Sequence, residues 1–342
     1  MTGSLNLRLV HRKKHATVIE QVVYCGETHI AVRGGNGLIN LYNAITGELF
    51  QTKVSASSMA WNASRQELAT GSRTGALVMW QIGSEGFKEA QSRTSSATGS
   101  IDYIAFTNHN VDFVTWNGQD LIQVWETATL RRERTITLPS PPTSLACSPV
   151  RAFLLVGFVS KTGYAYRQYD LSTSVVHEVP RGYRGTAFAW NRTGTVFAMA
   201  EKCSKHCRIL IVKGETRRTV ARFQAHIGTI TCLAWACRDK VLLSTGRDGF
   251  IRLWGVIPKT DCLSYVHAHP KGCNMFALSP AGTHVVSGSF DKLVKVWEIK
   301  QMREVQTQIE WGEEWAAVEL QRQIRGCLAR TRLRRRFRLL AL

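Results

Sequence analysis

The chain has 342 residues, of which 20% are charged and 44% hydrophobic, a composition typical of a globular protein rather than a disordered one. Its net charge of +19 predicts attraction to an acidic protein, a nucleic acid, a tubulin-like polymer or an anionic membrane, without choosing among them. No apolar run reaches the ~18–20 residues of a membrane span, and nine scattered cysteines indicate a reduced, intracellular chain rather than a disulfide framework.

The N-terminal segment, residues 5–10, has the alternation of a β-strand. Leu5, Leu7 and Leu9 are separated by polar residues, which is strand periodicity and not helical periodicity. The first 19 residues also contain four basic residues and no acid, which by itself suits a mitochondrial transit peptide. The alternation favours the strand.

From residue 16 to residue 299 a short apolar run recurs, and it ends in all cases but one in an aromatic residue. The steps between these end residues are 38, 45, 44, 42, 43 and 43 residues, and a four-stranded propeller blade spans ~40–45 residues. Seven end residues therefore predict an all-β fold, a seven-bladed propeller over residues 1–300. They are Tyr42, Trp80, Trp125, Tyr169, Ile211, Trp254 and Trp297.

Two of the predicted blades share four polar and aromatic positions, with the same spacing from His to Asp and from Asp to Trp in both. In these residues the chain resembles the WD-repeat family, and the resemblance covers roughly residues 5–300. It implies that each set forms a buried hydrogen-bonded network within its blade, a structural role that says nothing of function. The sets are His226, Ser244, Asp248 and Trp254 in blade six, and His269, Ser287, Asp291 and Trp297 in blade seven.

The other blades depart from this pattern. Blade one has part of it in His15, Asn36 and Tyr42, and blades two to five lack the His–Asp pair. Two segments alternate where the strand that closes the ring belongs, residues 5–10 and residues 304–309, and we favour the first.

Three residues stand just before the turn Asp, or its equivalent, of their blades: Arg73, Arg247 and Phe290. The resemblance implies that this position faces the upper surface of the ring, where partners often bind. The alternative is that they are ordinary turn residues.

Residues 301–342 are predicted to form a C-terminal α-helix. Acidic residues come first and arginines are concentrated toward the end, in residues 320–342, an order that suits the helix dipole. Apolar residues recur at every fourth position, which predicts one apolar stripe.

Within this segment, residues 320–333 resemble a complete IQ motif, with Ile324 where an aromatic is common. The resemblance implies binding of calmodulin or a related EF-hand protein by a helix in a groove. The motif positions and their apolar neighbours are Leu320, Gln321, Ile324, Arg325, Gly326, Leu328, Arg330 and Leu333. The alternatives are a helix that docks on the propeller, and a nuclear-localisation or nucleic-acid patch around residues 334–336.

The sequence predicts no catalytic residue, cofactor or metal. Cys203, His206 and Cys207 offer three zinc-ligand types without the fourth that a structural site needs. No nucleophile elbow, paired carboxylates or phosphate loop followed by a helix is present.

These observations predict a non-catalytic scaffold. We expect the propeller to dock on a large ciliary, flagellar or microtubule assembly in the cytoplasm while the IQ helix recruits an EF-hand protein. The alternative is an RNA-associated propeller of ribosome assembly or a mitochondrial ribosome, with a nucleolar or mitochondrial location and arginines that contact phosphates.

Overall fold

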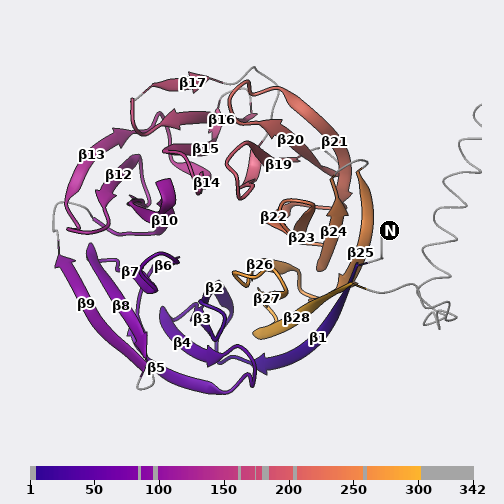
Figure 1. Cartoon of the computed structure of the whole chain (residues 1–342), viewed down its shortest axis with the longest axis horizontal. Helices are drawn as coiled ribbons and strands as arrows, with labels where there is room; N and C mark the ends of the chain where they lie inside the picture. Colours follow the sequence, from indigo (N-terminus) through magenta and orange to yellow (C-terminus); the bar gives the residue numbers. More distant parts are fainter. Residues whose placement is uncertain are drawn as a thin grey trace, which may run out of the picture. The chain divides into compact units, whose positions relative to one another are not determined.

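The computed structural model describes residues 5–83, 86–94, 99–160, 163–173, 175–178, 185–202, 206–256 and 260–301. In these ranges the chain forms seven four-stranded antiparallel sheets, which follow one another around a ring (Figure 1). The predicted seven-bladed β-propeller is confirmed. Of residues 301–342, which the sequence predicts to form a C-terminal helix, residue 301 belongs to a strand, and the rest of that segment, with the IQ motif and residues 304–309, lies outside the described residues.

Each blade runs from an innermost to an outermost strand in chain order, except that blade seven takes its outermost strand from the N-terminus. Blade one contains β2 (Ile19–Cys25), β3 (His29–Gly34), β4 (Leu38–Asn43) and β5 (Leu49–Ser55). Blade two contains β6 (Ser58–Asn62), β7 (Glu67–Gly71), β8 (Ala76–Gly83) and β9 (Gly86–Thr94). Blade three contains β10 (Tyr103–Thr107), the short 3-10 helix η1 (Asn108–Asn110), β11 (Asp112–Trp116), β12 (Leu121–Glu126) and β13 (Arg132–Thr137). Blades four and five contain β14 (Pro142–Cys147), β15 (Phe153–Ser160), β16 (Gly163–Asp170) and β17 (Val176–Glu178); β18 (Gly185–Trp190), β19 (Val196–Lys202), β20 (Cys207–Lys213) and β21 (Thr219–His226). Blades six and seven contain β22 (Ile230–Ala236), β23 (Val241–Gly246), β24 (Phe250–Gly255) and β25 (Asp261–His267); β26 (Cys273–Leu278), β27 (His284–Ser289), β28 (Leu293–Gln301) and β1 (Leu5–Lys14).

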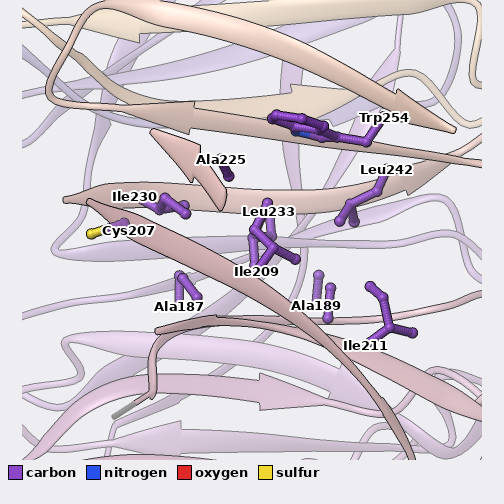
Figure 2. Packing of buried hydrophobic residues seen from close by; sticks show 12 residues of the cluster. Ala187, Ala189, Cys207, Ile209, Ile211, Ala225, Ile230, Leu233, Leu242 and Trp254 are labelled. Atoms are coloured by element: carbon purple, nitrogen blue, oxygen red, sulfur yellow. The ribbon is translucent and has the colours of Figure 1, made fainter. Parts of the chain in front are cut away.

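The core is divided into clusters between neighbouring blades, because each sheet is apolar on both faces in its inner strands. Between blades five and six, small side chains such as Ala187 and Ala189 face larger ones such as Leu233 and Leu242 (Figure 2). Leu242 is fully buried, and burial of such a side chain stabilises the fold by about 1.5–3 kcal/mol. The two blades are therefore held face to face by close apolar packing.

The N-terminal strand closes the ring. β1 pairs antiparallel with β28, from Leu5 opposite Gln301 to Lys14 opposite Leu293, and the indigo and yellow strands lie side by side in Figure 1. Leu7 is buried against the cluster that contains Trp297. The expected strand in residues 5–10, and closure by it, are confirmed, and the pairing covers the edge that β28 would otherwise expose.

In blade five the end residue predicted from the sequence is wrong by one position. Val212, not Ile211, lies opposite Phe197, the place that Trp254 takes opposite Leu242 in blade six. In both blades the pairing of the third strand with the outermost strand shifts register, just before Val212 in blade five and just before Trp254 in blade six. Without an aromatic residue to mark it, the position could not be distinguished from its apolar neighbour.

No helix in the described part of the chain is long and apolar enough to cross a bilayer.

Candidate interaction surface of blades six and seven

The four predicted residues of blade six come together in one buried network. His226 Nδ1 donates to Asp248 Oδ1 at 2.9 Å, and His226 Nε2 lies 2.7 Å from Ser244 Oγ. Trp254 Nε1 donates to the same Oγ at 2.8 Å. Because the ionised carboxylate of Asp248 can only accept, we assign the ring proton to Nδ1, and Nε2 then accepts the serine hydroxyl proton. Every polar group of the set therefore has a partner.

Blade seven repeats the arrangement. His269 Nδ1 donates to Asp291 Oδ2 at 2.8 Å, and His269 Nε2 lies 2.9 Å from Ser287 Oγ. Trp297 Nε1 donates to Ser287 Oγ at 2.9 Å. His226 and His269 lie shortly before β22 and β26, the innermost strands of their blades. Each network therefore joins the segment that leads into a blade to the hairpin formed by the second and third strands of that blade.

Burial sets the charge state of both networks. It lowers the pKa of His226 and of His269 below the usual value, which favours the neutral imidazole. Burial alone would raise the pKa of Asp248, but the hydrogen bond from His226 and the positive charge of Arg252 outweigh it and lower the pKa to about 2. Arg252 Nη1 lies 2.8 Å from Asp248 Oδ2. At neutral pH the carboxylate is ionised and the imidazole is not.

The same carboxylates fix the turns that carry two of the candidate contact residues. Asp248 Oδ1 accepts from the backbone N–H of Phe250 at 3.2 Å, and Asp291 Oδ1 accepts from that of Leu293 at 2.9 Å. Arg247 and Phe290 immediately precede these aspartates and are exposed. Each network thus holds a rigid turn from which one large side chain projects into solvent.

Backbone contacts join these turns into one surface, which we call the upper arc. Arg247 N donates to Thr229 O at 2.9 Å, and a Cβ on Gly272 would lie 3.2 Å from Arg247 O. Ser289 Oγ donates to Gly272 O at 2.5 Å, and His15 N donates to Lys292 O at 2.7 Å. The exposed side chains of the upper arc are Ile227, Arg247, Lys271, Phe290 and Lys292.

The upper arc presents cations together with apolar side chains. Phe290 is 52% exposed and Ile227 is 49% exposed, although both are large and hydrophobic. The side chains of Asp248 and Asp291 are only 10% and 11% exposed, so the charged side chains that the arc presents to solvent are basic. Arg73 is also exposed, in the corresponding turn of blade two, but blade one separates it from the upper arc.

Part of the network is present in blades where the sequence pattern was not recognised. Trp80 Nε1 donates to Thr70 Oγ1 at 2.7 Å in blade two, and Trp125 Nε1 donates to Thr115 Oγ1 at 2.8 Å in blade three. A threonine ten residues before the tryptophan, where Ser244 and Ser287 stand before theirs, was the signal in the sequence.

In blade one the partner of the histidine differs from the one expected. His15 Nε2 lies 2.6 Å from Asn40 Nδ2, and Asn40 Nδ2 donates to Tyr42 Oη at 3.3 Å. Asn36 instead caps its own turn, where its Oδ1 accepts from Leu38 N at 3.2 Å. Asn36 stands where Asp248 and Asp291 stand in their blades, but its hydrogen bond stays within the turn.

The described residues contain no group of three metal-ligating side chains. Cys207 is buried in the apolar cluster between blades five and six (Figure 2), and Cys203 lies outside the described residues. Cys207 therefore faces the core and not a surface site.

Comparison with protein families supports the repeats of these two blades. Residues 217–255 and 260–298 match the family model described as WD domain, G-beta repeat. Each match begins just before the outermost strand of one blade and ends on or directly after the core of the third strand of the next, in β24 and β28. The sequence repeat is therefore offset from the structural blade by one strand.

Curated relatives align at low identity. A probable cytosolic iron-sulfur protein assembly protein CIAO1 homolog from Schistosoma japonicum is 32% identical over 25% of this chain and 25% of its own length. THO complex subunit 3 from Arabidopsis thaliana is 22% identical over 74% of this chain and 67% of its own length. A ribosome biogenesis protein WDR12 homolog from Anopheles gambiae is 29% identical over 25% and 21%. The chain thus spans from about a fifth to two thirds of these proteins, whose names point to different processes.

Proposed function

We propose that this seven-bladed WD-repeat propeller is a non-catalytic protein-interaction scaffold, and that its upper arc binds a protein segment that combines acidic with apolar side chains. The observation that carries the proposal is the exposure of Phe290 and Ile227 between Arg247, Lys271 and Lys292. Aromatic residues, phenylalanine included, and arginine are enriched in protein interfaces relative to the rest of the surface. Cations around an apolar anchor favour an acidic partner through electrostatic complementarity.

Rigidity of the upper arc supports the same function. The turns of Arg247 and Phe290 are fixed by carboxylates that also bind His226 and His269. A surface that is ordered before binding loses little conformational entropy when a partner arrives. The networks are structural, and their contribution to binding is to hold these two side chains in place.

The proposal extends to the C-terminal segment on the strength of its sequence. Residues 320–333 match the IQ pattern, and the arginines concentrated in residues 320–342 suit the acidic surface of an EF-hand protein. We propose that this segment recruits calmodulin or a relative. We also propose that the propeller docks on a ciliary, flagellar or microtubule assembly in the cytoplasm, because both modules recur in such machinery and the positive charge suits acidic tubulin.

A second candidate function is association with RNA. A relative is named a ribosome biogenesis protein, and the net charge of +19 favours phosphate-rich partners. In this case the location is nucleolar or mitochondrial.

The upper arc is tested by the double variant Arg247→Glu, Phe290→Ala in quantitative affinity capture of the full chain from cells. Partners that bind the arc should fall at least tenfold, because the variant removes the apolar anchor and reverses a charge. Arg73→Glu is the matched control, since it changes an exposed arginine in the same turn of blade two. An unchanged partner profile in the double variant would contradict the proposal.

The C-terminal part is tested separately with purified full chain and calmodulin, with and without calcium. The variant Arg325→Glu, Arg330→Glu should weaken binding by at least tenfold, because two motif cations would face an acidic partner as anions. Absence of binding by the unaltered chain in both calcium states would remove this part of the proposal and leave the upper arc untouched.

A further inference from the structure

A second basic surface lies at the other end of the strands that carry the upper arc. β23 joins the turn at residues 237–240 to the turn of Arg247. A strand of six residues spans about 20 Å, so the two turns are on opposite faces of the ring. The surface, which we call the lower ridge, consists of the exposed side chains of Arg192, Lys213, Arg218, Arg238 and Lys240.

The turn at the centre of the lower ridge has an uncommon backbone. Cys237, Arg238 and Asp239 have φ angles of 50°, 55° and 66°, so three successive residues other than glycine adopt the left-handed conformation. Such residues are strained unless the surrounding structure holds them. No pattern in the sequence predicted this turn.

Asp239 holds the turn against the neighbouring blade. Its Oδ1 accepts from the backbone N–H of Arg192 at 2.9 Å, and its Oδ2 accepts from Asn191 Nδ2 at 3.1 Å. Asn191 is buried, and its own Oδ1 accepts from Thr195 N at 2.9 Å. The strained turn of blade six and the first hairpin of blade five are therefore one connected unit.

Further backbone hydrogen bonds join the remaining cations to this unit. Gly214 N donates to Thr195 O at 2.8 Å, and Lys213 N donates to Arg218 O at 3.0 Å. Beneath these turns, blades five and six share the apolar cluster shown in Figure 2. The five cations thus stand on a platform whose parts are fixed to each other.

Acidic groups on the lower ridge already have partners. The carboxylate of Asp239 accepts the two hydrogen bonds from blade five. Glu215 Oε1 lies 2.5 Å from Arg151 Nη1 in an ion pair. In residues 191–195, 213–218 and 237–240, all of which the structure describes, the other exposed long side chains are basic. The lower ridge is therefore cationic without the exposed apolar anchors of the upper arc.

We propose that the lower ridge binds the phosphate backbone of a nucleic acid. Rows of Arg and Lys on fixed turns suit repeated phosphates, which need no apolar contact, whereas the buried centre of a protein interface is depleted in charge. The inference deepens the second candidate function, because it places the contact on the propeller and not on the C-terminal arginines.

The test uses the full chain and a fluorescent 20-nucleotide RNA of mixed sequence, with affinity measured by anisotropy between 50 and 200 mM salt. The triple variant Arg192→Glu, Arg238→Glu, Lys240→Glu should bind at least tenfold more weakly at 100 mM salt. The slope of log affinity against log salt should flatten by about 2, because three phosphate contacts contribute about 0.7 each for a single strand. The matched control, Arg247→Glu, Lys271→Glu, Lys292→Glu, changes the net charge equally on the upper arc and should retain most of the affinity.

Equal losses in the two triple variants would overturn the proposal, since they would show a general effect of charge. An unchanged affinity in the lower-ridge variant would overturn it as well, and RNA that crosslinks only to residues 302–342 would leave the second candidate function standing without this site. If circular dichroism shows that a glutamate variant does not fold, the same two triple variants made with glutamine give the same comparison. Vesicles of phosphatidylcholine and phosphatidylserine in a four-to-one ratio form the last arm, and binding to them without binding to RNA would identify a membrane surface instead.

Discussion

Blades five and six have the same four antiparallel strands and the same register shift beside the third strand, yet they fill corresponding positions differently. Where blade six has Ser244 and Trp254, blade five has Met199 and Val212, which pack in an apolar cluster. The strand geometry therefore does not depend on the polar network. In blades six and seven the network instead holds in place a turn that carries an exposed arginine or phenylalanine.

The largest expected difference between the two blades is at the third-strand position. Trp254→Ala should lower the free energy of unfolding by about 3–5 kcal/mol, because it removes a buried ring and leaves the Ser244 hydroxyl with one partner fewer. Val212→Ala at the corresponding position should cost about 2 kcal/mol, since it removes only two methyl groups. Urea denaturation followed by circular dichroism measures both, and equal costs would show that the blades are stabilised in the same way.

A smaller effect is expected when the hydroxyl group at the centre of the network is removed. Ser244→Ala should cost about 1–3 kcal/mol, because His226 Nε2 loses its donor and Trp254 Nε1 loses its acceptor in a buried site. Ser244→Thr is the control, since Thr70 and Thr115 accept the tryptophan hydrogen bond in blades two and three. A threonine variant as unstable as the alanine variant would mean that side-chain volume, not the hydroxyl, matters here.

The pH dependence is the smallest of the three effects. Because the pKa of His226 and of His269 is lowered in the folded state, the unfolded chain binds more protons below the usual value of 6.5. Stability from these groups is complete above pH 6.5 and is lost progressively as the pH falls from there to their folded pKa values. The free energy of unfolding should therefore fall between pH 7.5 and 5.5, by at most about 1.4 kcal/mol for each of the two histidines.

The variant His226→Gln should reduce this drop, whereas Met199→Leu in blade five should leave it unchanged because neither side chain titrates. Urea denaturation at each pH gives the comparison. A drop that is the same in the histidine variant would assign the pH dependence to other groups. The loss from Asp248 belongs to a separate window, between pH 3.8 and about 2.

The sequence predicted the ring because its signal is periodic. Tryptophan or tyrosine marks the third strand of six blades, so spacing alone indicated the number of blades. The end residue of the third strand in blade five was predicted wrongly, because Val212 and Ile211 are both aliphatic and nothing in the sequence distinguishes them. Prediction also failed where the choice is geometric, as between Asn36 and Asn40, because only the turn conformation decides which amide reaches His15.

The two basic surfaces illustrate the same limit. Arg247 and Phe290 could be identified because a repeat position marks them, but the cations of the lower ridge are scattered over three turns and have no shared motif. Their proximity follows from hydrogen bonds between blades, such as the one from Arg192 N to Asp239. That bond joins residues 47 positions apart, which local sequence patterns do not reveal.

Pairing of β1 with β28 has a mechanical consequence. Leu5 lies opposite Gln301, so a force that pulls these two positions apart acts on the last rung of an antiparallel ladder and loads its hydrogen bonds one after another. Such peeling needs less force than sliding the strands along each other, where all rungs resist together. A partner that pulls on both positions at once would therefore separate β1 from β28 one hydrogen bond at a time and open the ring between them.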